Sequence, residues 1–471
     1  MAGITSYGAY IPVYRIAAEA FAQAWGTRYM AGEKAVAFYD EDSVTMGTAA
    51  AADCLGYSAP SEVDGLFLAS TTLPYKEKQM ATLIAEALDF PDTTRAVEFT
   101  NTLRCATSAM NSALDAINAG SLKNVLVTAA DCRMGTPASV REQQLGDGGA
   151  AVMFGDTDVA VEIESSYTIN KEITDVWRRD GERFIAGWED RWAILFGYQE
   201  PLKEAVNGLL QQSGLTPSDF SGIVIPAPDY RSHREIVANL GFDPKTQSQD
   251  PQFGTIGATG AAHALMILVA ALEQATAGDR ILFANYGNGA DAFVLRVTEH
   301  IEKAKRGRGI TEHLASKRPL NSYERYMRWH GLVEVEGSRR QPPFSSPTVL
   351  WREGEALLPF RGSRCRQCGL IDFPPQRICY QCGSKDDYDV IKLPKTGKLF
   401  TFTEDYLSGA AVEDFIGNPV IDLDGGGRMR TLMTECEAGE MQIDMPIELV
   451  FRKLHEGGGY PNYFWKARPV R

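Results

Sequence analysis

Four of the eight cysteines are spaced so that they can bind one metal ion. Cys365, Cys368, Cys379 and Cys382 form two C-x-x-C pairs separated by ten residues. Such pairs bring four thiolates to one tetrahedral point, which is the geometry that zinc prefers. Four cysteine ligands leave no coordination position for water, so we expect a structural Zn²⁺ and not a catalytic one. A zinc-free, degenerate ribbon and a redox pair of thiols are the alternatives.

Cys105 is the second candidate for chemistry. It follows the segment EFTNTLR and starts a run in which apolar residues recur with a period of about 3.6 residues, as in a helix. A thiol at a helix N-terminus lies at the positive end of the helix dipole, which lowers its pKa and favours the nucleophilic thiolate. The same position also suits a buried cysteine that packs as a small apolar side chain.

Three glycine-rich segments could supply backbone N–H groups to a reacting oxygen. They are GDGGAA (146–151), FGTIGATGAA (253–262) and NYGNGAD (285–291). Glycine allows sharp turns and close approach of the backbone to a ligand, and such loops can stabilise an oxyanion. None of the three has the phosphate-binding pattern G-x-x-x-x-G-K-[ST], and GTIGATGAA does not directly follow a strong strand, so a nucleotide site is not indicated.

The first 300 residues alternate β-rich runs with Ala-rich helical runs, which predicts α/β layering. Strands are predicted at 63–70, 124–131, 150–155, 221–227, 279–287 and 291–297, and helices at 80–88 and 105–120. Residues 112–131 also resemble residues 269–287, each an Ala-rich helix, a glycine and a strand. This similarity predicts two related α/β halves, unless any two such units would look alike.

Composition limits the classes of function. The chain has 471 residues, 44% hydrophobic residues and a net charge of −14, so it is globular and a poor general binder of nucleic acid. No apolar run reaches the ~20 residues that span a bilayer, and the N-terminus lacks the basic and apolar regions of a signal peptide. We therefore expect a soluble, cytoplasmic protein that binds neither membrane nor nucleic acid.

The sequence changes character after residue 300. A charged stretch (299–318) and QPPFSSP (341–347) precede the cysteine pairs, and we place a domain boundary near residue 338. Short β-like runs follow at 398–407, 418–424, 428–437 and 445–454. Several short strands in so few residues predict a small barrel. Its many Asp and Glu residues argue against single-stranded nucleic acid as its ligand.

Residues 1–335 resemble the thiolase superfamily, and within it the archaeal and bacterial hydroxymethylglutaryl-CoA (HMG-CoA) synthases. The resemblance rests on GITSYGAYIPVYRI, STTLPY, NTLRCATSAMNSALDAI, VWRRDG, IPAPDYR, GATGAAHALMILVAALEQA, NYGNGADAF and NSYERYMRWHG. Residues 340–471 are similar to DUF35 proteins, in which a zinc ribbon (FRGSRCRQCGLIDFPPQRICYQCGS) precedes an OB-fold. DUF35 proteins accompany thiolases and HMG-CoA synthases as partner subunits.

The resemblance implies a duplicated thiolase-type αβαβα fold, followed by a zinc ribbon and a small OB-fold β-barrel. The domains would be 1–338, with halves of about 1–160 and 161–338, then a linker and ribbon at 339–386 and the OB-fold at 387–471. It further implies a homodimer through the thiolase domain, an acyl-CoA substrate with CoA as product, and a possible complex with another acyl-CoA enzyme. The OB-fold would help to hold CoA.

The resemblance makes Cys105 the nucleophile that accepts the acyl group. It also indicates three departures from the family pattern: Thr71 stands where HMG-CoA synthases have Glu, Pro226 where they have His, and Ala258 where they have Asn. None of these three side chains can replace the missing acid/base and donor groups. The departures suggest a substrate or a reaction order other than that of HMG-CoA formation.

Other residues are candidates for the missing roles. We predict His263, Asn285 and Asn288 as catalytic residues, and Gly289, Thr71 and Arg231 as contacts to substrate or oxyanion. His263 could instead be a hydrogen-bonded core residue, and the two asparagines could be turn formers. His233, next to Arg and Glu, is interpreted as part of a solvated helix face.

Three functions remain open at this point. The first is a CoA-dependent acyltransferase that forms or thiolytically cleaves a carbon–carbon bond by Claisen-type chemistry through a Cys105 thioester. The second is a non-catalytic scaffold or acyl-CoA-binding partner with a degenerate thiolase fold. The third is a CoA-linked aldolase. Retention of Cys105 favours the first, whereas the departures at Pro226 and Ala258 favour the second.

Overall fold

The computed structural model describes residues 2–28, 31–56, 60–305, 307–334, 344–407 and 413–471. The chain forms two compact units. The first comprises Met1–Ala37, Asp42–Ala85 and Phe90–Tyr323, and the second comprises Phe38–Glu41, Glu86–Asp89 and Glu324–Arg471. The boundary predicted near residue 338 lies outside the described residues. No helix in the described ranges is long and apolar enough to span a bilayer.

The first unit is built on a mixed sheet of nine strands in the order β11-β12-β13-β8-β1-β7-β6-β4-β5. In chain order the strands are β1 (Gly3–Tyr10), β4 (Gly65–Ala69), β5 (Arg95–Phe99), β6 (Val125–Cys132), β7 (Asp147–Gly155), β8 (Val161–Asn170), β11 (Gly222–Val224), β12 (Arg280–Tyr286) and β13 (Gly289–Val297). Strands β4, β5 and β6 pair in parallel, and β6–β7, β7–β1 and β1–β8 pair antiparallel.

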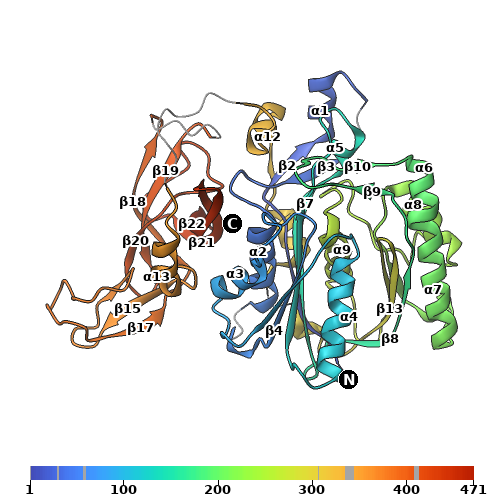
Figure 1. Ribbon diagram of the computed structural model, residues 1–471, viewed down its shortest axis with the longest axis horizontal. Coiled ribbons are helices and arrows are strands. Elements are labelled where there is room, and N and C mark those ends of the chain that lie inside the picture. Colours follow the sequence, from blue (N-terminus) through green and yellow to red (C-terminus); the bar gives the residue numbers. More distant parts are fainter. Residues whose placement is uncertain (1, 29–30, 57–59, 306, 335–343, 408–412) are drawn as a thin grey trace. The chain divides into compact units, whose positions relative to one another are not determined.

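Helices lie in three layers: one between the two halves of this sheet and one on each outer face (Figure 1). Helices α4 (Cys105–Asn118) and α9 (His263–Leu272) lie between the two halves of the sheet, and their apolar side chains share one core with both halves. Helices α2 (Ser43–Leu55) and α3 (Met80–Ala87) cover one outer face, and α7 (Glu200–Ser213) and α8 (Tyr230–Asn239) cover the other. The αβαβα layering that the sequence indicated is confirmed.

Shorter elements complete the first unit. A small sheet joins β14 (Arg318–Pro319), β2 (Tyr14–Ala17) and β3 (Glu33–Val36), and β9 (Val176–Trp177) pairs with β10 (Ala186–Gly187). The remaining helices are α1 (Ala18–Trp25), α5 (Val140–Gln144), α6 (Asp190–Trp192), the π-helix Ala193–Gln199, α10 (Ile301–Ala304) and α11 (Gly309–Ala315).

The predicted strands and helices of the first unit are present. The six strand predictions correspond to β4, β6, β7, β11, β12 and β13, and the two helix predictions to α3 and α4. The two similar segments both fold as a helix followed by a strand, α4–β6 and α9–β12. Helix α2 was not predicted, because its Ala-rich sequence lacks a clear apolar stripe; it starts where the Asp42 carboxylate accepts hydrogen bonds from the N–H groups of Val44 and Thr45.

The second unit contains two antiparallel sheets. The ribbon sheet has the order β16-β15-β17, and the larger sheet has the order β20-β19-β18-β21-β22 and curls as a half-barrel of OB type (Figure 1). Its elements are α12 (Tyr323–Trp329), α13 (Pro347–Leu357), β15 (Arg361–Cys365), β16 (Ile371–Asp372), β17 (Tyr388–Lys392), β18 (Thr396–Asp405), β19 (Ile416–Leu423), β20 (Arg428–Arg430), β21 (Pro446–Gly457) and β22 (Tyr460–Pro469). Strand β22 was not predicted.

A buried ionic cluster lies in the second unit. The Arg452 side chain is fully buried and forms ion pairs with Glu41 at 2.9 Å and with Glu435. Lys466 pairs with Asp40 at 2.8 Å, and both side chains are 1% exposed. Burial raises the pKa of Glu435, but the surrounding arginines outweigh it and lower that pKa to about 2. These charges stabilise the unit only as a complete set, because a single unpaired charge in the interior is costly.

We predict that Arg452→Met destabilises the second unit by about 3–5 kcal/mol, because Glu41 would lose its ion pair with Arg452 and Glu435 would lose one of its three arginine partners. Arg428→Met is the matched control: Arg428 forms an exposed pair with Asp422, so its loss should cost less than about 1 kcal/mol. Urea unfolding of the full chain, followed through tryptophan fluorescence, measures both changes. Equal stabilities of the two variants would contradict the prediction.

Candidate active site

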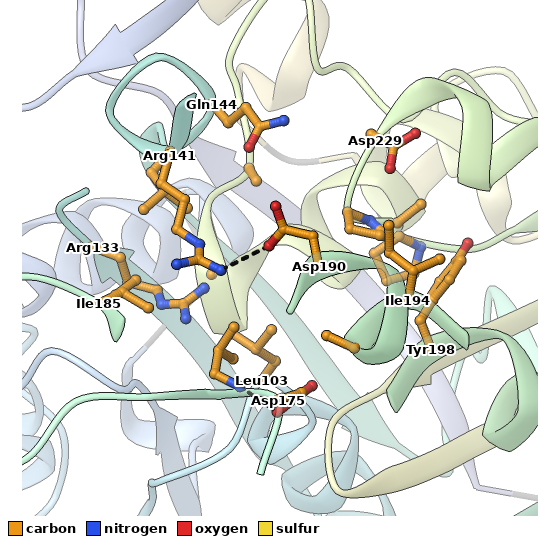
Figure 2. Close-up of a pocket in the computed structure, with 18 of the residues that line it drawn as sticks. Leu103, Arg133, Arg141, Gln144, Asp175, Ile185, Asp190, Ile194, Tyr198 and Asp229 are labelled. Atoms are coloured by element: carbon orange, nitrogen blue, oxygen red, sulfur yellow. Dashed lines mark hydrogen bonds and ion pairs between the residues drawn. The ribbon is translucent and has the colours of Figure 1, made fainter. Parts of the chain in front are cut away.

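A cavity of about 640 Å³ opens in the first unit (Figure 2). Its lining residues come from the loops that follow β6, β9 and β11 and from the segment before α4. Others come from α5, the π-helix, the start of α9 and the end of β12. Those used below are Leu103, Arg133, Arg141, Asp175, Tyr198, Pro226, Ala258, Gly260, His263, Asn285 and Tyr286. Apolar side chains such as Val176, Ile185 and Ile194 line the rest. An apolar cavity with a few convergent polar groups is typical of a site for a small molecule.

Cys105 lies beside this cavity, at the first residue of α4, where the sequence placed it. The residue is buried, with 1% exposure, and Leu103, two residues before it, lines the cavity. Asn285, from the end of β12, donates a hydrogen bond from Nδ2 to the Leu103 carbonyl at 3.4 Å. The nucleophile that the sequence indicated and the cavity therefore belong to the same part of the first unit.

Arg104 fixes the position of the cysteine. Its guanidinium donates to the carbonyls of Gly287 and Ile169, both at 3.1 Å, and to Oδ1 of Asn170 at 2.7 Å. It also forms an ion pair with Asp291 at 3.2 Å. Because these partners lie on β8 and around the β12–β13 turn, Arg104 ties the N-terminus of α4 to the other half of the sheet.

The protonation state of Cys105 differs from the expectation. Burial raises the pKa of the thiol, and the negative charge of Asp131 adds to this effect. The backbone N–H groups of Cys105 and Ala106 and the charge of Arg133 act in the opposite direction but do not prevail. The prediction that the helix N-terminus would hold the pKa low is therefore wrong for the protein without ligand, because desolvation outweighs the dipole.

Asp131, near the end of β6, organises the polar side of the site. It is fully buried, and its carboxylate accepts hydrogen bonds from Ser70 Oγ (2.9 Å), from the N–H and Oγ1 of Thr71 (2.7 and 2.8 Å) and from Thr72 Oγ1 (2.9 Å). A fifth donor is the Ala261 N–H, just before α9, at 2.7 Å. Thr71 thus hydrogen-bonds to Asp131 and is not among the residues that line the cavity.

His263 is both buried and part of the cavity wall. Its ring stacks on Phe253 with 5.5 Å between centroids, and its Nδ1 lies 3.2 Å from Thr259 Oγ1. The Thr259 N–H donates to the same Nδ1 at 3.4 Å, and a hydrogen bond with the Pro251 backbone acts to raise the pKa of the ring. Burial lowers the pKa of His263 to about 4, so its imidazole is neutral near pH 7.

His233 is not part of a solvated face, so that interpretation is wrong. It is 4% exposed, because its side of α8 packs against the unit. Burial lowers its pKa to about 4, as for His263. Charged residues that follow a histidine in the sequence, here Arg234 and Glu235, do not show which side of the helix the imidazole occupies.

The remaining predicted site residues are divided between the cavity and its surroundings. Asn285 lines the cavity, whereas Asn288 is exposed and donates from Nδ2 to the Ile173 carbonyl at 3.0 Å. Gly289 has φ +120°, and a Cβ there would lie 2.1 Å from the Ile169 carbonyl oxygen, so the turn requires glycine. Arg231 is exposed on α8 and is not among the lining residues. The roles assigned to these residues stay predictions.

Sequence reasoning missed several polar residues of the cavity. Arg133, Asp175, Tyr198 and Tyr286 all line it, and Figure 2 shows the Arg133 guanidinium directed into it. The one available signal was the position of Arg133 directly after a predicted buried strand, where ligand sites of α/β sheets commonly lie. The departures from the family pattern at Pro226 and Ala258 also line this cavity.

The four predicted metal ligands lie together in the second unit. Cys365, Cys368, Cys379 and Cys382 place their Sγ atoms within 4.8 Å of one another, with 3.6 Å between Cys365 and Cys382 and 3.5 Å between Cys368 and Cys379. Metal–sulfur bonds of ~2.3 Å in a tetrahedron place the sulfurs about 3.8 Å apart. The four thiols therefore fit one tetrahedral metal ion.

Comparison with known proteins agrees with this division into units. A crystal structure of HMG-CoA synthase complexed with CoA superposes with a TM-score of 0.64 at 18% identity, covering 73% of this chain and 94% of that one. Residues 355–387 match the family described as "ChsH2, rubredoxin-like zinc ribbon domain". The protein therefore combines a thiolase-type fold with a C-terminal zinc ribbon.

Relatives that are similar in sequence identify the family within this fold class. The HMG-CoA synthase of Aeropyrum pernix is 33% identical over 345 residues, which cover 71% of this chain and 95% of that protein. That of Methanopyrus kandleri is 30% identical over 335 residues, covering 69% and 95%. The chain belongs to the hydroxymethylglutaryl-CoA synthase family, with a zinc ribbon and an OB-type half-barrel in its C-terminal part.

We predict that the first unit loses stability as the pH falls from about 6.5 towards 4. The folded state keeps His233 and His263 neutral down to a pKa of about 4, whereas both titrate near 6.5 when unfolded, so acid favours unfolding. Each histidine contributes roughly 2–3 kcal/mol of this loss. Unfolding free energies measured at pH 7 and pH 4.5 should differ less in His263→Gln than in the wild type.

His300→Gln provides the control for this measurement. It removes a histidine whose side chain is 37% exposed instead of a buried one. An unchanged difference in His263→Gln would show that His263 is not held neutral by burial.

Proposed function

We propose that the protein is a CoA-dependent acyltransferase that forms or thiolytically cleaves a carbon–carbon bond through a thioester on Cys105. The observation that carries this proposal is the position of Cys105 at the start of α4, two residues after Leu103, which lines the cavity together with His263 and Asn285. Membership of the HMG-CoA synthase family supports CoA-dependent Claisen-type chemistry at the level of the family. The departures that the resemblance indicates at Pro226 and Ala258 support a substrate or a reaction order other than that of HMG-CoA formation.

The first step transfers an acyl group. The Cys105 sulfur attacks the thioester carbon of an acyl-CoA, the bond from that carbon to the CoA sulfur breaks, and the thiol proton ends on the released CoA. Because burial raises the pKa of the thiol, this proton has to leave as the sulfur attacks. We assign its transfer to the neutral imidazole of His263, which lines the same cavity and can take a proton only on the ring nitrogen that carries none.

The second step forms a carbon–carbon bond. A second acyl-CoA loses a proton from its α-carbon, and the resulting carbanion attacks the thioester carbon on Cys105. The new bond forms as the carbon–sulfur bond breaks, and the Cys105 thiolate is regenerated. Thiolytic cleavage is the same sequence in reverse. A scaffold that only binds acyl-CoA would share the cavity but would not become acylated.

We predict that incubation with acetyl-CoA adds one acetyl mass to the wild-type protein and none to Cys105→Ala, because the proposed reaction attaches the acyl group to the Cys105 thiol. Cys54→Ala removes another buried thiol, in α2, and should become acylated like the wild type. Intact-protein mass spectrometry provides the measurement. If neither acetyl-CoA nor longer acyl-CoAs acylate the wild type, the scaffold function replaces the acyltransferase.

For the second unit we propose that the four-cysteine site binds Zn²⁺ in a structural role. A ribbon of three short strands buries too little apolar surface to be stable alone, so the metal would contribute to folding. The four ligands would all be protein thiolates, which leaves the ion without a position for substrate.

Elemental analysis of the purified full chain should therefore find one zinc per molecule. Cys365→Ser should lose most of this zinc and lower the stability of the second unit, whereas Cys436→Ser changes a buried cysteine of the same unit outside the ligand set and should retain it. A folded ribbon without metal would contradict the proposal.

A further inference from the structure

Arg133 is an unusual residue within the cavity. It follows β6, and its guanidinium points into the cavity space between Arg141 and Asp175 (Figure 2). Among the described residues, no group lies within hydrogen-bond or ion-pair distance of this guanidinium. Asp131 and Asp175 act on it only through their charges at longer range. Arg141, in contrast, pairs with Asp190 at 3.1 Å at the cavity wall.

Arg133 is half-buried at the cavity wall, and desolvation lowers the pKa of its guanidinium although the nearby carboxylates act in the opposite direction. Asp131 cannot serve as its hydrogen-bond partner, because five other donors already occupy that carboxylate. The N–H groups of Arg133 are therefore available to an acceptor that enters the cavity from outside the protein. Such an acceptor would be an oxygen atom of the substrate.

The backbone around Arg133 is built to hold the side chain in place. Gly260, just before α9, has φ +61°, and a Cβ there would lie 2.7 Å from Arg133 Cδ and 2.2 Å from Asp131 Oδ2. Any other residue at this position would displace the stem of Arg133 or the Asp131 carboxylate. The arginine thus occupies a space that the fold leaves open for it.

The cavity also lacks other donors at the positions where the resemblance expects them. Pro226 and Ala258 both line it, and neither side chain can donate a hydrogen bond. Arg133 supplies N–H groups and a positive charge to the same cavity. A positive charge fixed where negative charge develops is an effective way to stabilise a transition state.

We propose that Arg133 is a catalytic residue that hydrogen-bonds to the substrate oxygen that becomes negatively charged when an acyl-CoA loses its α-proton. The carbon–hydrogen bond breaks, its electron pair moves to the carbonyl oxygen to form an enolate, and the proton passes to a base, His263 in the proposed reaction. This inference rests on the proposed function.

The ionisation of bound acetoacetyl-CoA tests this role without turnover. In Cys105→Ala, which cannot be acylated, the near-ultraviolet absorbance of the enolate is followed as the pH is raised and external buffer takes the proton. We expect the midpoint to lie at least about one pH unit below that of free acetoacetyl-CoA, a tenfold change in the ionisation constant. Adding Arg133→Met should return the midpoint to the free value, and Arg133→Lys should give an intermediate one.

Two controls separate the possible outcomes. Arg280→Met removes an arginine that pairs with Glu164 at the surface and should leave the midpoint shifted. Equilibrium dialysis measures binding, and circular dichroism measures folding. If Arg133→Met does not fold, Arg133→Gln takes its place in the comparison.

Binding with an equal midpoint with and without Arg133 would overturn the inference and leave the acyltransferase proposal intact. Failure of Cys105→Ala to bind acetoacetyl-CoA and every longer 3-oxoacyl-CoA would overturn the proposed function, and the inference with it.

Discussion

The buried carboxylate of Asp131 is the constraint on which the site depends. It receives hydrogen bonds from the segment after β4 through Thr71 and from the start of α9 through Ala261. An uncompensated carboxylate in this core would be prohibitively costly, so these elements must converge on it. Their convergence sets the position of the Gly260 backbone and leaves the space that Arg133 occupies. The negative charge of Asp131 also adds to the effect of burial in raising the pKa of Cys105. The same carboxylate therefore holds these elements together and affects the thiol.

The cavity combines family features with a different set of polar groups. Cys105, the nucleophile of the proposed function, is the first residue of α4, and the cavity wall is apolar at Pro226 and Ala258. Arg133 brings a positive charge to the cavity and His263 a neutral imidazole. His263 lies in a segment on which the family resemblance rests, whereas Arg133 lies outside those segments. In the proposed function, such a set of groups would keep the thioester chemistry and change which carbonyl compounds the site can activate.

Local sequence patterns predicted the framework well. Buried β-branched runs predicted β4, β6 and β12, and the periodicity after Cys105 placed the first residue of α4 correctly. The partners of Asp131 lie 60 and 130 residues away in the chain, so no local pattern could reveal that carboxylate as an organising group. The same limit applies to His233, which looked solvated beside Arg and Glu, and to Arg133, whose lack of a partner is a property of the folded cavity alone.

Arg104 has a consequence for the order of events in catalysis. Its hydrogen bonds to Gly287, Ile169 and Asn170 hold the residue before Cys105 against the opposite half of the sheet. An acyl group attached to Cys105 would therefore stay where it was loaded, since its carrier cannot swing to a second station as a tethered arm would. In the proposed reaction, the first CoA would therefore have to leave before the second acyl-CoA binds. This order of binding and release gives ping-pong kinetics.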